Sequence, residues 1–266
     1  MLFTLTTSCG GAAAPSSDAV SPEQVEDAVD MLDTGDSGAN RVGSDALGAD
    51  TGMEGGEVAV SVIEGGSYAC TPPGTGPFPG VLYNHGGLAT AVGGDLEATC
   101  RALAEAGYIA YSKQRRLGDS PAIAGHIDDL YEGLDALLAL EGCDPDRVGI
   151  MGFSRGGLLT LQAATERPDA FRAVVTMAPA SAKGLLDDVL EDADKIAAPV
   201  LVLVSINDLI QDDHVTLAQD VVDALEAEGK AVEQIVYDAY GDDGHERFFT
   251  VGDYWTDVTN FLATHL

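Results

Sequence analysis

Gly152, Ser154 and Gly156 form a Gly-x-Ser-x-Gly pattern, the part of this sequence with the clearest chemical meaning. A strand-like stretch with Val148 and Ile150 precedes the pattern and an apolar helical stretch follows it. Glycines two residues to either side leave room for a sharp turn, which exposes the serine hydroxyl at the N-terminus of the helix. The pattern therefore predicts a nucleophilic serine. The alternative is an ordinary glycine-rich turn between a strand and a helix.

A serine hydroxyl needs a neighbouring base at neutral pH, and His245 is the predicted base. It follows Ser154 in the chain and lies in a polar loop between a strand and the last helix. The other histidines are His85 and His126, which precede the serine, His214, which begins a helix, and His265, which lies at the C-terminus. The alternative for His245 is a histidine of a surface loop.

Asp208 is the predicted acid that orients His245. It directly follows a buried apolar strand, and a carboxylate at this point can reach the far ring nitrogen of the histidine. Asp212 and Asp213 are alternatives, but both lie where a side chain would cap the next helix. The chain order of serine, acid and histidine is the order that this kind of strand–turn–helix nucleophile requires.

Two backbone N–H groups are expected to stabilise a tetrahedral oxyanion. One belongs to Arg155, directly after the nucleophile. The other is expected from the loop that begins at His85, whose His-Gly-Gly sequence resembles a motif of lipases and esterases. The donor in this loop is Gly86 or Gly87, and Leu88 is the next candidate. His85 itself is expected to brace the loop.

Strands and helices alternate from residue 57 onward. We expect strands at 58–62, 80–84, 107–112, 147–151, 172–177, 199–205 and 231–237, and helices at 94–106, 121–140, 155–166, 213–228 and 250–264. This alternation predicts one α/β domain over residues 57–266, with a mostly parallel sheet and helices on both faces. The segment 180–198 is either a small lid over the site or an amphipathic helix packed on the core.

Residues 57–266 resemble the dienelactone-hydrolase-like branch of the α/β-hydrolase superfamily. The resemblance rests on residues 84–87, the motif around Ser154, the strand that ends at Asp208, and His245 after a glycine. It implies the α/β-hydrolase fold and hydrolysis of small-molecule or polymeric carboxylic esters, with no metal and no cofactor. Dienelactone hydrolases have a cysteine where this chain has Ser154, which favours a general serine esterase over ring opening.

Two alternatives to ester hydrolysis remain. The same triad would serve a peptidase or a thioesterase, because the fold does not select among acyl bonds. A non-catalytic binding protein on a hydrolase fold is the second alternative, and it would be expected to lack a member of the triad.

The N-terminal region is interpreted as an export signal and a tether. Residues 1–9 resemble the end of a bacterial lipoprotein signal peptide with Cys9 as the lipidated residue, although no Lys or Arg precedes their short apolar stretch. Residues 10–56 are rich in Gly, Ala, Ser and Asp and predict an acidic disordered tether. We therefore expect a bacterial protein that is secreted or anchored in the cell envelope. The alternative is a tail with an incidental cysteine.

The charge of the chain limits its partners. Asp and Glu total 44 against 13 Lys and Arg, which gives a formal net charge of −31. Such a surface repels nucleic acid and anionic lipid, so membrane contact is expected only through a lipid anchor. Arg115 and Arg116 form a rare basic pair. They either pair with acidic neighbours or, as arginines do in the namesake enzymes, hold a substrate carboxylate.

Three cysteines lie within the predicted domain: Cys70, Cys100 and Cys143. They contain no Cys-x-x-Cys pair, so a zinc site is not expected. One disulfide with one free thiol is expected in an oxidising compartment, in any of three pairings. Three reduced cysteines are the alternative.

Overall fold

The computed structural model describes residues 56–87, 91–116 and 125–266. They belong to one compact unit. The predictions for the N-terminal region, including Cys9, and for Leu88 lie outside the described residues. None of the described helices combines the length and apolar character that a membrane-spanning segment requires.

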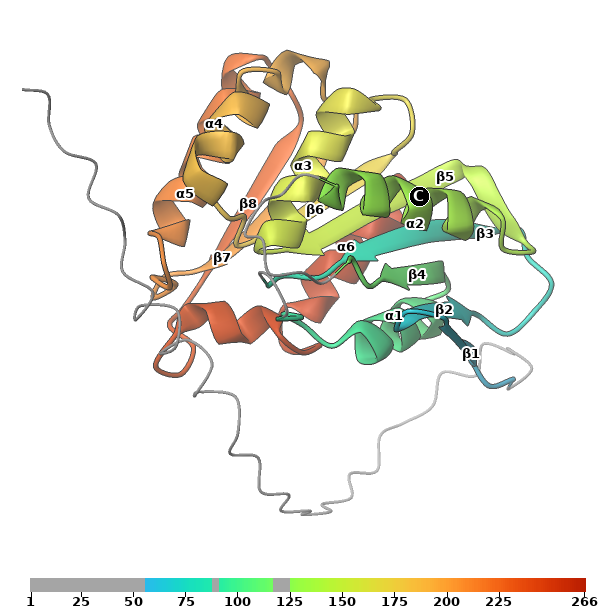
Figure 1. Cartoon of the computed structure of the whole chain (residues 1–266). Coiled ribbons are helices and arrows are strands. Elements are labelled where there is room, and N and C mark those ends of the chain that lie inside the picture. Colours follow the sequence, from blue (N-terminus) through green and yellow to red (C-terminus); the bar gives the residue numbers. More distant parts are fainter. Residues whose placement is uncertain (1–55, 88–90, 117–124) are drawn as a thin grey trace, which may run out of the picture. The chain divides into compact units, whose positions relative to one another are not determined.

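An eight-stranded sheet forms the centre of this unit (Figure 1). Its strands are β1 (Ala59–Ile63), β2 (Ser67–Thr71), β3 (Phe78–Asn84), β4 (Ile109–Lys113), β5 (Cys143–Phe153), β6 (Ala173–Met177), β7 (Val200–Ser205) and β8 (Val232–Tyr237). Their order across the sheet is β1-β2-β4-β3-β5-β6-β7-β8. The six strands β4, β3, β5, β6, β7 and β8 are parallel to one another, and β2 is antiparallel to both of its neighbours, β1 and β4. The predicted, mostly parallel sheet is confirmed.

Helices cover both faces of the sheet. They are α1 (Leu96–Glu105), α2 (His126–Leu138), α3 (Arg155–Glu166), α4 (Leu185–Leu190), α5 (His214–Ala227) and α6 (Trp255–His265). Figure 1 shows α2 to α5 on one face and α1 and α6 on the other. Each face has its own apolar cluster: Leu134, Leu161 and Val221 belong to the first, and Leu103 and Leu262 to the second. The prediction of helices on both faces is confirmed.

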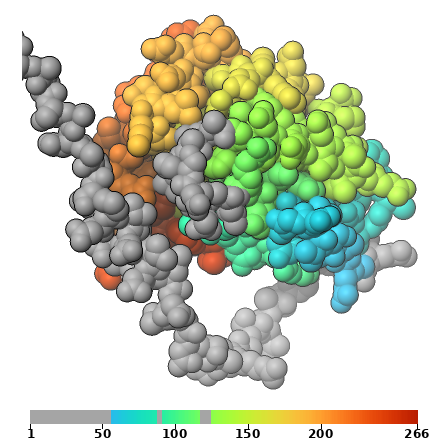
Figure 2. Space-filling view, in the orientation of Figure 1, coloured from blue at the N-terminus to red at the C-terminus, as the bar shows by residue number. Residues whose placement is uncertain are grey.

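Helix α4 occupies the segment for which a lid was one of two interpretations. Its Leu186 and Val189 are buried in the same apolar cluster as residues of α3 and α5. In the space-filling view, the visible atoms of this helical layer, coloured from green to orange, lie together in the upper part of the molecule (Figure 2). The structure thus favours core packing for α4.

Strand β2 is a strand that the sequence did not indicate. Ala69 and Cys70 are both buried, but they belong to the apolar clusters on opposite faces of the sheet. A strand covered on both faces has no alternation of apolar and polar residues, so the period-two signal is absent.

A disulfide joins Cys70 of β2 to Cys100 of α1, with 5.7 Å between their Cα atoms, and Cys143 is a free thiol. This is one of the three predicted pairings.

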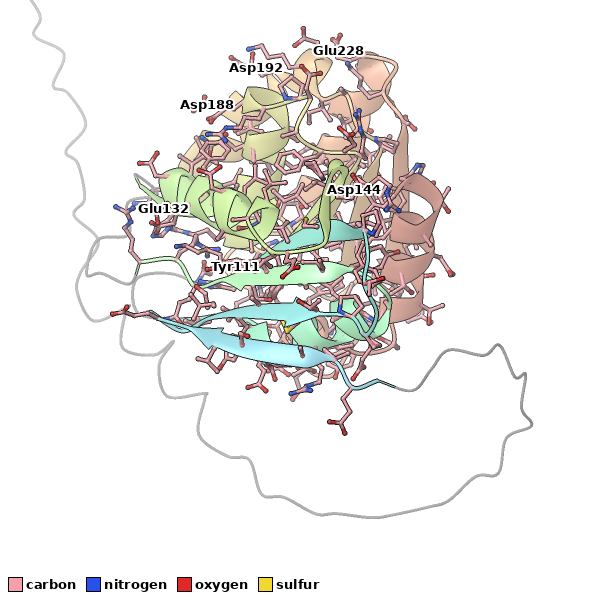
Figure 3. All side chains as sticks on the ribbon, turned by 90° about the vertical axis from the view of Figure 1, so that its right-hand side faces the viewer. Tyr111, Glu132, Asp144, Asp188, Asp192 and Glu228 are labelled. Atoms are coloured by element: carbon pink, nitrogen blue, oxygen red, sulfur yellow. A yellow bond between two sulfur atoms is a disulfide. The ribbon has the colours of Figure 1, made fainter. Side chains whose placement is uncertain are left out.

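Acidic side chains lie on the outside of the helical layer. Glu132 of α2, Asp188 of α4 and Glu228, which follows α5, are exposed, and Figure 3 shows them at the edge of the molecule and pointing outward. These three carboxylates are therefore solvated groups on the outer surface of this layer.

Candidate active site

Ser154 lies in the turn between β5 and α3, as the sequence predicts. Its φ of 53° is in the left-handed region, which non-glycine residues adopt rarely and at a cost. The neighbouring strand holds the turn, because the Ser154 N–H donates to the carbonyl oxygen of Met177 at 2.8 Å. The turn is therefore kept in place by the sheet around it.

The two glycines of the motif permit close approach of backbone. A Cβ on Gly156 would lie 2.0 Å from the carbonyl oxygen of Asn84, and a Cβ on Gly152 would lie 2.2 Å from the carbonyl oxygen of Gly156. Neither position has space for a side chain. The pattern around Ser154 thus reflects packing against β3 as well as the shape of the turn.

Asp208 and His245 form a buried pair. Asp208 is fully buried in the loop after β7, and His245 lies in the short 3-10 helix Gly244–Phe248 after β8. Nδ1 of His245 is 2.9 Å from both carboxylate oxygens of Asp208. A carboxylate only accepts, so Nδ1 carries the proton and Nε2 is left as the basic nitrogen.

Aromatic packing brings His245 to the nucleophile turn. The ring of Phe153, the residue before Ser154, lies 4.6 Å from the His245 ring between centroids. Phe248 and Phe249 also pack against Phe153, at 6.0 Å and 5.3 Å. Since parallel strands end at the same edge of the sheet, the turn after β5 and the loops after β7 and β8 meet there.

Asn207 and Arg247 support this arrangement, and sequence reasoning did not single out either of them. Asn207 links the two loops, since its Nδ2 donates to Tyr240 O at 3.2 Å and its Oδ1 accepts from Tyr240 N at 3.0 Å. Nε of the buried Arg247 donates to Ser205 Oγ at 2.9 Å. Their positions next to the acid and two residues after the base are the signals in the sequence that could have indicated them.

The loop after β3 lies against the nucleophile. A Cβ on Gly86 would lie 3.1 Å from the Cβ of Ser154. The N–H of Gly86 donates to Gly93 O at 2.7 Å and so belongs to the internal bonding of the loop. The Gly86 N–H is therefore already bonded, and of the two glycines that the sequence did not separate, Gly87 stays the predicted donor. Arg155, as the first residue of α3, places its backbone N–H at the N-terminus of that helix.

His85 braces this loop and stays neutral. Its Nε2 accepts from the backbone N–H of Arg115 at 3.2 Å, so its Nδ1 carries the proton and donates to Gly86 O at 2.5 Å. Burial and the charge of Arg115 lower the pKa of His85 to about 3. These contacts agree with a bracing role and leave no basic nitrogen for Ser154.

The two adjacent arginines have different surroundings. Arg116 forms an ion pair with Asp129, with 2.5 Å between Nη2 and Oδ1. Arg115 is buried, and its Nη2 donates to Gly86 O at 3.3 Å, while its Nε and Nη1 have no partner. Burial and the nearby Arg155 lower the pKa of Arg115 to about 10, so it remains charged at neutral pH. Arg115 thus binds a backbone carbonyl oxygen of the loop after β3.

Asp208, His214 and His245 are the group of described residues that could hold a metal ion, because their ligand atoms lie within 4.8 Å of one another. All three are buried, and the hydrogen bond between His245 and Asp208 already accounts for their closeness. The grouping therefore does not require a metal ion.

Solved structures with a similar fold include peptidases and a hydrolase. An acylaminoacyl peptidase of Pyrococcus horikoshii has a TM-score of 0.60 at 20% identity, over 79% of this chain and 41% of that one. Dipeptidyl peptidase 4 of Porphyromonas gingivalis has a TM-score of 0.59 at 17% identity, over 79% of this chain and 35% of that one. A putative dienelactone hydrolase from Klebsiella pneumoniae has a TM-score of 0.57 at 21% identity, over 77% of this chain and 98% of that one.

Sequence similarity is concentrated in a shorter segment. The model of the prolyl oligopeptidase family matches residues 123–186, which contain Ser154. A stretch of 54 residues is 48% identical to dipeptidyl peptidase 8 of mouse and of human, and it makes up 20% of this chain and 6% of each of those proteins. The chain thus spans a small part of these curated relatives.

The chain has the α/β-hydrolase fold, as the sequence predicts. The neighbouring structures do not single out the dienelactone-hydrolase-like branch, because peptidases resemble the chain as closely.

Proposed function

We propose that this chain is a serine hydrolase that cleaves carboxylic esters through an acyl-enzyme. The observation that carries the proposal is the buried hydrogen bond of 2.9 Å between His245 and Asp208, next to a serine held at a φ of 53°. A charge-assisted histidine pair beside a half-buried serine hydroxyl in a strained turn is what nucleophilic catalysis needs.

The proposed reaction proceeds in two halves. Ser154 Oγ attacks the carbonyl carbon while Nε2 of His245 takes its proton, and Asp208 stabilises the imidazolium that forms. The N–H groups of Arg155 and Gly87 bind the oxyanion. His245 then protonates the leaving alcohol, and the acyl group remains on Ser154. Water attacks the acyl-enzyme with His245 again as base, and this step releases the acid.

The resemblance of residues 57–266 to the dienelactone-hydrolase-like branch supports an ester as the proposed substrate. The similar fold of the putative dienelactone hydrolase from Klebsiella pneumoniae is in keeping with it. The proposed substrate is therefore a small or polymeric carboxylic ester.

Peptide hydrolysis is the second candidate function. The match of residues 123–186 to the prolyl oligopeptidase family favours it, because this segment contains the nucleophile turn. The same triad would cleave an amide if His245 protonated a leaving amine. A thioester is a third acyl bond open to the same chemistry.

Labelling with a fluorophosphonate tests the hydrolase itself. We expect wild type to be labelled and Ser154→Ala to remain unlabelled, with the same circular dichroism spectrum for both. Equal labelling of the two proteins would remove Ser154 as nucleophile. Absence of labelling in a folded wild type would favour the non-catalytic binding protein.

A matched pair of chromogenic substrates then separates ester from peptide. The p-nitrophenyl ester and the p-nitroanilide of one N-acetylated amino acid present the same acyl group with different leaving groups. An esterase is expected to cleave the ester and to leave the anilide nearly untouched. Comparable kcat/KM values for the two would transfer the proposal to peptide hydrolysis.

Export with a lipid anchor at Cys9 is a further part of the proposal. It is supported by the resemblance of residues 1–9 to a lipoprotein signal and by the disulfide between Cys70 and Cys100, since disulfides form in oxidising compartments. Metabolic labelling with palmitate in a bacterial host tests it. We expect label in the product of the full gene and none in Cys9→Ala, and an unlabelled wild type would count against the anchor.

A further inference from the structure

His214, the first residue of α5, lies beside the Asp208–His245 pair and takes no part in the reaction proposed above. Its side chain is buried, with 3% of its surface exposed. The His214 and His245 ring centroids are 4.5 Å apart, and Nε2 of His214 is 3.8 Å from Oδ1 of Asp208. His214 is therefore adjacent to both the acid and the base.

Both ring nitrogens of His214 face backbone carbonyl oxygens. Nδ1 is 3.1 Å from Pro179 O, and Nε2 is 3.1 Å from Ile210 O. A carbonyl oxygen only accepts, and a neutral imidazole has a single N–H, so the neutral ring can donate to only one of the two. The imidazolium can donate to both. An acceptor is therefore in place for a second proton on this ring.

The carboxylate of Asp208 has one strong partner. Both of its oxygens share the Nδ1–H of His245, and within the described part of the chain no other side chain donates to it. A proton on His214 would place a positive charge 3.8 Å from this buried carboxylate. Attraction between such charges is strong where water is excluded. The same charge would lie next to the ring of His245.

We propose that His214 is a positioning residue of the triad whose protonation switches the hydrolase off. As a neutral ring, it packs against His245 and keeps it in line with Asp208. As an imidazolium, it pairs with Asp208 and opposes the positive charge that His245 acquires when it takes the proton of Ser154. The inference rests on the proposed function, since it assigns a regulatory role within the same triad.

The groups that face His214 set the pH range of this switch. Burial lowers the pKa of His214, Asp208 raises it and His245 lowers it, and the net direction is downward. Asp213, the cap of α5, is adjacent in the chain, and hydrogen bonds from Thr216 hold the pKa of its carboxyl low, so it stays negatively charged. The switch is therefore expected below the ordinary histidine pKa of 6.5.

The test follows the rate of fluorophosphonate labelling of Ser154 against pH, which requires no knowledge of the natural substrate. As the pH is lowered, the labelling rate of wild type is expected to fall because two protons are taken up, by about 100-fold per pH unit in the steepest range. The labelling rate of His214→Gln is expected to fall with the uptake of one proton, by about 10-fold per pH unit. His265→Gln is the matched control, because the ring of His265 packs on Phe261 in α6. This variant is expected to keep the two-proton loss.

A one-proton loss in wild type, or a two-proton loss in His214→Gln, overturns the role of His214 and leaves the proposed function intact. A folded wild type that is not labelled at any pH overturns the proposed function instead.

In that case, or if His214→Gln does not fold, an NMR titration of the histidine ring carbons in wild type and Asp208→Asn decides. The inference requires the His214 titration to move to lower pH when the negative charge of Asp208 is removed. An unchanged titration overturns it.

Discussion

Replacing Asp208 with asparagine tests the electrostatic core of the proposed mechanism. The substitution keeps the shape of the side chain but removes its charge from a fully buried position. The carboxylate now accepts from Nδ1 of His245 at 2.9 Å through both oxygens. In the variant, the amide oxygen can still accept, but no negative charge faces the imidazolium that forms during the reaction.

The size of the effect follows from the distance between these charges. A full charge on each group, about 3.5–4 Å apart at an effective dielectric constant near 20, interacts with about 4–5 kcal/mol. The loss of this interaction in the transition state lowers kcat by roughly 10³-fold or somewhat more. Ground-state binding does not involve the charged imidazole, so KM is expected to change little.

The stability of the same variant is not expected to fall together with its activity. A buried carboxylate with a single donor carries a desolvation cost, and asparagine removes the charge that causes it. We expect Asp208→Asn to melt at the same temperature as wild type or at a higher one. A loss of rate in a protein of undiminished stability would separate the electrostatic role of Asp208 from a structural one.

The assay compares the initial rate on a p-nitrophenyl ester with the thermal melting curve of each protein. Asp212→Asn is the matched control, because Asp212 follows in the same loop and accepts from Ser181 Oγ at 2.6 Å. It is expected to retain activity within about threefold, as surface substitutions usually have small effects. The reasoning is refuted if Asp208→Asn keeps more than a tenth of the wild-type rate, or if Asp212→Asn loses as much.

Three further predictions concern the supports of the site. Arg115→Met removes the cation that binds the loop after β3 and is expected to lower kcat by about tenfold. The melting temperature is expected to stay within a few degrees, because two of the buried nitrogens of Arg115 have no partner to lose. An unchanged kcat would remove its bracing role. Gly156→Ala places a Cβ 2.0 Å from Asn84 O, and urea unfolding should show a loss of about 3 kcal/mol or more, or no folded protein; a loss below about 1 kcal/mol would contradict the close approach. Reduction of the disulfide between Cys70 and Cys100, 30 residues apart, should lower the free energy of unfolding by about 3–4 kcal/mol by the loop-entropy estimate, measured in urea with and without reductant; equal midpoints would show that the disulfide does not stabilise the sheet edge.

The proposed triad could be recognised in the sequence because each member stands in a strong local context. Ser154 lies between an apolar strand and an apolar helix, Asp208 directly follows a buried strand, and His245 lies in a polar loop before the last helix. Hydrophobic periodicity locates such elements, and parallel strands bring their carboxyl ends to one edge. The order of strands and turns along the chain was therefore enough to propose which side chains meet.

Contacts between distant segments were decided only by the tertiary structure. The hydrogen bond from Gly86 to Gly93 occupies one of two N–H groups with equal sequence signals, and it depends on how the loop after β3 folds back on itself. The pairing of Cys70 with Cys100 depends on β2, a strand without a periodic signal because both its faces are covered.

The surroundings of buried polar side chains also depended on the tertiary structure. Arg115 and Arg116 are adjacent and alike in the sequence, yet one pairs with Asp129 and the other holds a carbonyl oxygen of the loop after β3. His214 was interpreted only as the start of a helix, and its closeness to Asp208 and His245 arises where the first residue of α5 packs against the residues after β7 and β8. The sequence alone determined most of the elements and the nucleophile turn, because these follow from local propensity and periodicity. The partners of each buried polar group were decided by packing, since burial leaves a polar atom only the acceptors and donors that the fold places beside it.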